Sequence, residues 1–149
     1  MTYKEIEKKM TSEEGIVSIL DELQSNHFQC IDYNAGLFRD GSLSDSSLLQ
    51  TCIDELTGVY MDLQTFYMVA LVTKINKEGN HYHDSKITHD KSSSKYTHAS
   101  LEKEASFMVS NERRILHILE GKINACEKAI STCQSRMRLM SKEIEHLSK

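Results

Sequence analysis

The spacing of apolar residues along the chain predicts helices, because most of these positions recur at steps of three and four. The clearest run has ten members with alternating steps: Leu116, Leu119, Ile123, Cys126, Ile130, Cys133, Met137, Met140, Ile144 and Leu147. A strict repeat of 3.5 residues is typical of a coiled-coil or helix-bundle seam. We therefore predict a long helix over residues 98–147, capped by Thr97 or Ser100.

A second long helix is predicted over residues 45–77, capped by Asp45 or Ser44 and stopped by Gly79. Its apolar positions are Leu49, Cys52, Leu56, Val59 or Tyr60, Leu63, Phe66 or Tyr67, and Ala70. A short amphipathic helix is expected over residues 12–26, with Ile16, Ile19, Leu20 and Leu23 on one face. Residues 28–44 fit either further helical turns or a loop.

These elements predict one all-α domain over residues 1–149. It has a short N-terminal helix and two long antiparallel helices, which are joined by a polar loop at residues 79–97. The C-terminal seam either packs only within the chain or also joins subunits. We expect both, and hence a homo-oligomer, because two long helices and a short one leave a thin core. The absence of proline from the chain permits such long helices.

Charge is distributed unevenly along the chain. Residues 1–64 hold four Lys and Arg against twelve Asp and Glu, residues 65–99 hold five against three, and residues 100–149 hold nine against seven. The four cysteines form no CxxC pair and match no zinc spacing, so free thiols in a cytoplasmic protein are expected. The longest apolar run, at residues 66–72, is too short for a membrane span.

One polar segment, residues 81–98 (HYHDSKITHDKSSSKYTH), is rich in histidine, serine and lysine. Its histidines follow no zinc-ligand spacing, so we expect no metal site and no cofactor. Lysines and tyrosines suit phosphates and bases, which favours a nucleic-acid contact. A solvated linker is the simpler interpretation of the composition alone.

Catalytic chemistry is not expected. The sequence contains no P-loop and no GxGxxG motif. Cys52, Cys126 and Cys133 fall on predicted apolar helix faces, where a cysteine nucleophile would lack a fixed histidine partner.

The segments LVTKINKEGNHYHDSK at residues 71–86 and KYTHASLEKEASFMVSNERRILHILEGKINACEKAI at residues 95–130 resemble phage recombination mediators of the UvsY type. In this chain, as in that family, a segment with lysine and tyrosine follows one long helix, and a capped amphipathic helix comes next. The resemblance extends over about residues 65–149. The acid-rich first 64 residues depart from that family, as does the smaller number of basic residues around the loop.

The resemblance implies a helical oligomer in the cytoplasm of a phage host. Such a protein binds single-stranded DNA and helps a recombinase replace a single-strand-binding protein, without hydrolysing a nucleotide. The residues expected to contact DNA are Lys74, Lys77, Tyr82, Lys86, Lys91, Lys95, Tyr96, Arg113 and Arg114. The alternative is a phage helical coiled-coil protein without DNA binding, such as an assembly factor or an inhibitor of a host protein.

Overall fold

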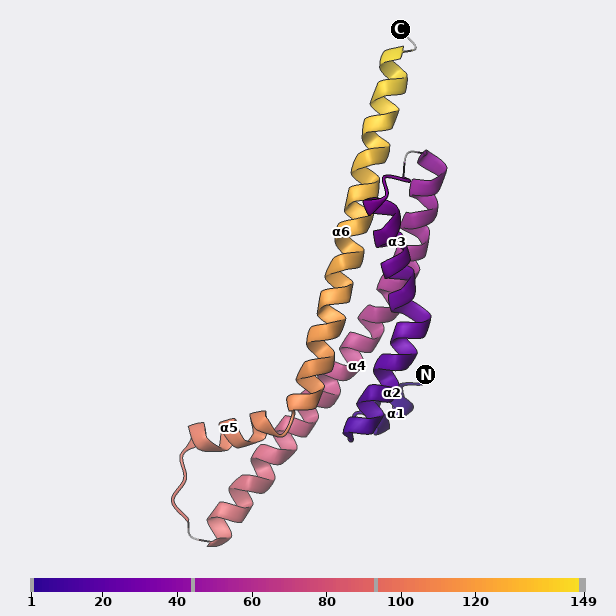
Figure 1. Ribbon diagram of the computed structural model, residues 1–149. Coiled ribbons are helices and arrows are strands. Elements are labelled where there is room, and N and C mark those ends of the chain that lie inside the picture. The colour runs from indigo at the N-terminus through magenta and orange to yellow at the C-terminus, as the bar shows by residue number, and fades with distance from the viewer. Residues whose placement is uncertain (1, 44, 93, 148–149) are drawn as a thin grey trace. The chain divides into compact units, whose positions relative to one another are not determined.

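The computed structural model describes residues 2–43, 45–92 and 94–147, without the side chains of Tyr3, Ile144, Glu145 and Leu147. These residues form helices and no strand, which confirms the predicted all-α class (Figure 1). The elements are α1 (Tyr3–Lys9), α2 (Glu13–Leu23), a π-helical turn η1 (Gln24–Phe28), α3 (Gln29–Arg39), α4 (Ser46–Ser92), α5 (His98–Phe107) and α6 (Ser110–Leu147). No helix in the described part is long and apolar enough to cross a membrane.

The predicted loop at residues 79–97 is wrong over residues 79–92, because α4 continues without a break to Ser92, and it is confirmed over residues 94–97 (Figure 1). Gly79 therefore does not end the helix. A single glycine costs only about 1 kcal/mol relative to alanine in a helix interior. Leu101 and Ala105 of α5 are fully buried, so packing in this region offsets that cost. At the other end, Asp45 caps α4, since its carboxylate accepts a hydrogen bond from the Ser47 amide at 3.3 Å.

The predicted single helix over residues 98–147 is divided into α5 and α6. Thr97 caps α5 and forms a reciprocal capping box with Ser100, which confirms Thr97 as the cap out of the two predicted residues. The break at Met108 and Val109 contains neither glycine nor proline. Val109 is fully buried, so burial of this side chain favours the turn. The Arg113 amide then donates to the Val109 carbonyl and starts α6.

The N-terminal third is more helical than predicted. The expected helix at residues 12–26 is α2 and the first part of η1. The open question over residues 28–44 is settled as helix by α3 up to Arg39 and as a turn at residues 40–43, while Ser44, a predicted cap of α4, lies outside the described residues. Ser12 accepts a hydrogen bond from the Gly15 amide at the start of α2. Gly41, with φ of 69°, ends α3 in the left-handed conformation, while the Ser42 amide bonds to the Leu37 carbonyl.

The chain divides into two compact units, and the expectation of a single domain stays a prediction. Unit 1 comprises residues 1–20 and 66–118, and unit 2 comprises residues 21–65 and 119–149. In unit 2, η1 and α3 pack with the first part of α4 and most of α6. In unit 1, α1 and the start of α2 pack with the second part of α4, α5 and the first turns of α6. In unit 2 the two long helices run antiparallel, because Cys52 lies beside Cys133 and Tyr60, further along α4, donates to Glu127, which comes earlier in α6.

Candidate interaction surfaces of unit 1

The histidine-rich segment is an ordered part of unit 1, where α4, the connection and α5 are held together by side-chain hydrogen bonds. Tyr82 Oη lies 2.7 Å from His98 Nδ1, and Tyr96 Oη donates to Asp90 at 2.6 Å. The bond to Asp90 raises the pKa of Tyr96. His89 lies 2.6 Å from the Ser94 hydroxyl and 3.7 Å from a Glu104 oxygen. The hydroxyl groups of both tyrosines are thus bonded within the unit, and stacking of their rings on bases stays a prediction.

Three of the predicted DNA-binding cations are paired with carboxylates. Lys74 lies 2.7 Å from Glu78, and Arg113 lies 2.9 Å from the same carboxylate. The hydrogen bond from Lys74, followed by the charge and hydrogen bond of Arg113, lowers the pKa of Glu78. Lys77 donates to the fully buried Glu112 at 2.6 Å. These ion pairs hold the three cations within unit 1, and their contact with DNA stays a prediction.

The other predicted cations are available. Lys86, Lys91, Lys95 and Arg114 are exposed, and within the residues that the structure describes none of them forms an ion pair. Across the same residues, no group of three or more His, Cys, Asp or Glu side chains is placed to hold a metal ion. The histidines of residues 81–98 therefore form no such group within the described part of the chain.

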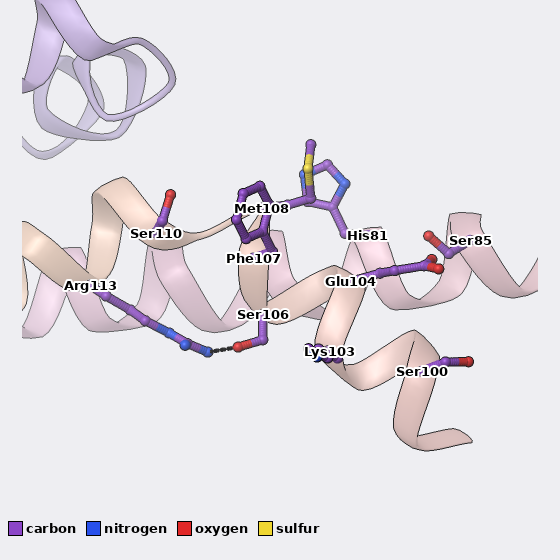
Figure 2. A pocket seen from close by; sticks show the side chains of 10 residues that line it. All are labelled: His81, Ser85, Ser100, Lys103, Glu104, Ser106, Phe107, Met108, Ser110 and Arg113. Carbon is purple, nitrogen blue, oxygen red and sulfur yellow. Dashed lines mark hydrogen bonds between the residues drawn. The ribbon is translucent and has the colours of Figure 1, made fainter. Parts of the chain in front are cut away.

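A groove that sequence analysis missed lies beside the junction of α5 and α6, with a volume of about 880 Å³. It is lined in part by His81 of α4, Lys103 of α5 and Arg113 of α6, and Figure 2 shows Phe107 and Met108 next to His81. Phe107 is 78% exposed and Met108 is 51% exposed. The same view shows Arg113 hydrogen-bonded to Ser106, so its guanidinium is held on the wall of the groove.

A second exposed apolar surface runs along α4. Met68, Val72 and Ile75 are each more than half exposed, at 53%, 52% and 55%. Steps of four and three place them on one stripe of the helix, which we call the outer stripe. Ala70 is buried and Lys77 reaches Glu112 from the opposite side of α4. The apolar run at residues 66–72 signalled this surface, because a helix that is apolar all round requires cover on every side.

Two hollows flank the outer stripe. One, of about 290 Å³, is lined by Glu7 of α1 together with Met68, Val69, Val72 and Thr73. The other, near α5, is lined by Ile75, Glu78, Gly79, Tyr82, Glu102 and Ala105. Among the described residues, no Lys, Arg or His lines either hollow. Glu7 and Glu102 are exposed and have no ion-pair partner within the described part of the chain.

The predicted C-terminal seam is buried over part of its length. Leu116 lies in unit 1. In unit 2 the buried members are Leu119, Ile123, Cys126 and Cys133, while Ile130, Met137 and Met140 are half-buried. The side chains of Ile144 and Leu147 lie outside the described residues. An oligomer contact through this seam stays a prediction.

Unit 2 gathers the four cysteines. Cys52 and Cys133 are buried with their sulfurs 3.5 Å apart, and all four thiols are free. Burial, together with the neighbouring Cys133, raises the pKa of Cys52 to about 12. Burial likewise raises the pKa of Cys126 to about 11. These thiols are packing groups, as their apolar positions in the sequence predict.

No protein-family model matches this chain, and comparisons with curated proteins and with solved structures also gave no match. The resemblance to UvsY-type mediators therefore stays a prediction from the sequence.

Proposed function

We propose that this chain is a non-enzymatic helical interaction protein that binds a helix of a partner protein on the outer stripe of α4. The observation that carries the proposal is the exposure of Met68, Val72 and Ile75 on one face of a helix whose opposite face is buried. Contiguous exposed apolar side chains rimmed by polar groups are typical of protein-binding surfaces. Anchors at steps of four and three fit the apolar face of a second helix.

Site-specific photo-crosslinking tests this function. A photoreactive residue in place of Val72 is expected to form a discrete adduct with another protein in cells that express the chain naturally. The matched control is Leu139 of α6 in unit 2, which is also exposed and apolar, at 61%. Adducts of the same kind and yield from both positions, or none from Val72, would contradict the proposal.

A second candidate is the single-stranded DNA binding of a recombination mediator. Lys86, Lys91, Lys95 and Arg114 favour it, because they are exposed without ion pairs among the described residues. The exposed ring of Phe107 adds an aromatic face in a groove that Lys103 also lines.

An anisotropy titration with a labelled oligonucleotide at two salt concentrations tests this second candidate. Replacing Lys86, Lys91 and Lys95 with alanine is expected to weaken binding and to reduce the salt slope by about 0.7 for each phosphate that is no longer neutralised. The variant Lys74→Ala is the control, because Glu78 already pairs with Lys74. Binding that is absent, or equal in the wild type and the triple variant, would rule this function out for the segment.

A further inference from the structure

The two sides of the outer stripe carry the same sign of charge. On one side Glu7 borders Met68 and Val72, and on the other side Glu102 and Glu78 border Ile75. Glu78 is already neutralised by Lys74 and Arg113. Glu7 and Glu102 are therefore the two carboxylates that remain available at the edges of this apolar surface.

This arrangement differs from the groove at the α5–α6 junction. That groove is lined by His81, Lys103 and Arg113 against one carboxylate, Glu104. Unit 1 has nearly balanced charge, with eleven Lys and Arg and ten Asp and Glu. The acidic edges of the stripe thus reflect the local placement of side chains and not the net charge of the unit.

We propose that the outer stripe binds a basic amphipathic helix, whose apolar residues cover Met68, Val72 and Ile75 while lysines or arginines at its edges approach Glu7 and Glu102. This inference rests on the proposed function and adds the chemistry of the partner. Charge complementarity across the edges favours a basic helix over an acidic one. It also disfavours a second copy paired stripe to stripe, because two sets of exposed carboxylates would then meet.

The apolar residues and the carboxylates have separable roles. Covering half-exposed methionine, valine and isoleucine removes apolar area from water, which supplies affinity whatever the charge of the partner. Ion pairs at the exposed edges contribute less and select the sign of the partner's charge. Substitutions in the stripe and at its edges are therefore expected to change binding in different ways.

The probe is a labelled synthetic peptide of about 15 residues, long enough to form four turns, with leucines on one face and lysines elsewhere. A matched peptide carries glutamates in place of the lysines. Anisotropy titrations of the full chain are expected to show tighter binding of the leucine–lysine peptide. The variant Met68→Gln/Val72→Gln/Ile75→Gln is expected to abolish binding, with circular dichroism confirming that it folds.

The edge variant Glu7→Gln/Glu102→Gln is expected to bind the leucine–lysine peptide roughly threefold to tenfold more weakly and with a smaller salt dependence. Its control is Glu104→Gln, on α5 but lining the other groove, which is expected to bind as the wild type does. Equal binding of both peptides, with the stripe variant alone impaired, would overturn the basic partner and leave the proposed function standing.

Two other outcomes would overturn the inference together with its basis. If the stripe variant binds the peptide as the wild type does, the peptide lies elsewhere and the stripe is not a docking surface. If analytical ultracentrifugation shows a wild-type dimer that the stripe variant converts to a monomer, a second copy covers the stripe.

Discussion

Helix α4 contributes to both units, and its two parts expose apolar residues differently. In unit 2, Leu49, Cys52, Leu56 and Leu63 are buried, and the Cys52 sulfur lies 3.5 Å from the Cys133 sulfur of α6. Two apolar residues of that part, Leu48 and Met61, are also exposed; Leu48 lies on another face of α4, whereas Met61 precedes Met68 by two helical turns and is in line with the stripe. In unit 1, Met68, Val72 and Ile75 share a stripe and remain exposed. The same helix thus serves an internal core in one part and offers a binding surface in the other.

The polar contacts of the two units also differ. In unit 2, Lys122 is bonded to Asp32 at 3.0 Å and Tyr60 donates to Glu127 at 2.9 Å, and the buried Asn34 donates to Glu55 at 3.1 Å. In unit 1 a charged pair, Lys77 with Glu112, lies inside the packing itself. One Glu112 oxygen has no hydrogen-bond partner among the described residues. The buried polar side chain of unit 1 is therefore a charged carboxylate paired with a lysine, whereas that of unit 2 is the neutral amide of Asn34.

The largest effect is expected from a charge placed in the core of unit 2. Ile123 is 6% exposed, so Ile123→Asp is expected to destabilise the fold by roughly 3–5 kcal/mol, which combines lost burial with an unpaired charge. Ile130→Asp, at a half-buried seam position, is expected to cost less, and Leu139→Asp almost nothing. Urea unfolding measures all three. Equal losses at Ile123 and Leu139 would show that α6 does not pack as described.

Breaking the buried pair of unit 1 ranks second. Lys77→Met leaves the Glu112 carboxylate buried without its cation, at an expected cost of about 2–4 kcal/mol since Lys77 keeps some solvent contact. The double variant Lys77→Met/Glu112→Met is expected to recover much of this loss, because it removes the uncompensated charge. Urea unfolding of both variants at neutral pH tests this. A double variant that is less stable than Lys77→Met would contradict the role given to the pair.

Much of the fold follows from the sequence, since the all-α class and the two long antiparallel helices come from apolar periodicity alone. Local signals were less decisive where packing overrides them. Gly79 predicted the end of the helix, but α4 continues past it. The break between α5 and α6 at Val109 contains no glycine or proline that could have predicted it. The ion pairs of Lys74, Lys77 and Arg113 depend on which carboxylates the fold brings beside them, which composition cannot show. The outer stripe was visible as the apolar run at residues 66–72, but its exposure depends on which neighbours cover it.

The buried thiol of Cys52 in unit 2 makes the stability of the folded state depend on pH. Because the pKa of Cys52 rises from 9.0 to about 12, the folded state resists deprotonation. The unfolded chain loses this proton from about pH 9, so the stability contributed by Cys52 is retained below pH 9 and is lost as pH rises towards 12.

A thiol-reactive disulfide reagent at pH 8 is therefore expected to label half-exposed Cys30 well before Cys52, Cys126 and Cys133. Denaturant should make all four thiols react at similar rates. Rapid labelling of Cys52 in the native protein would show that unit 2 opens readily and does not keep this thiol buried.

A smaller effect is expected at the end of α4 in unit 1. Tyr82→Phe removes an exposed contact with His98 and is expected to cost about 0.5–1.5 kcal/mol. Thermal unfolding measures this change, with Tyr33→Phe on the exposed face of α3 as a control. A change equal to that of the control would mean that the Tyr82–His98 contact does not help to hold α5.

Whether the outer stripe serves a partner or the fold is tested by the stability of the free chain carrying Met68→Gln, Val72→Gln and Ile75→Gln together, measured by urea unfolding against the wild type. If the outer stripe serves a partner and not the fold, the three substitutions are expected to change the unfolding free energy by no more than about 0.5 kcal/mol each, as exposed positions do. A loss of several kcal/mol would contradict the account, because these side chains would then belong to the core of the folded chain.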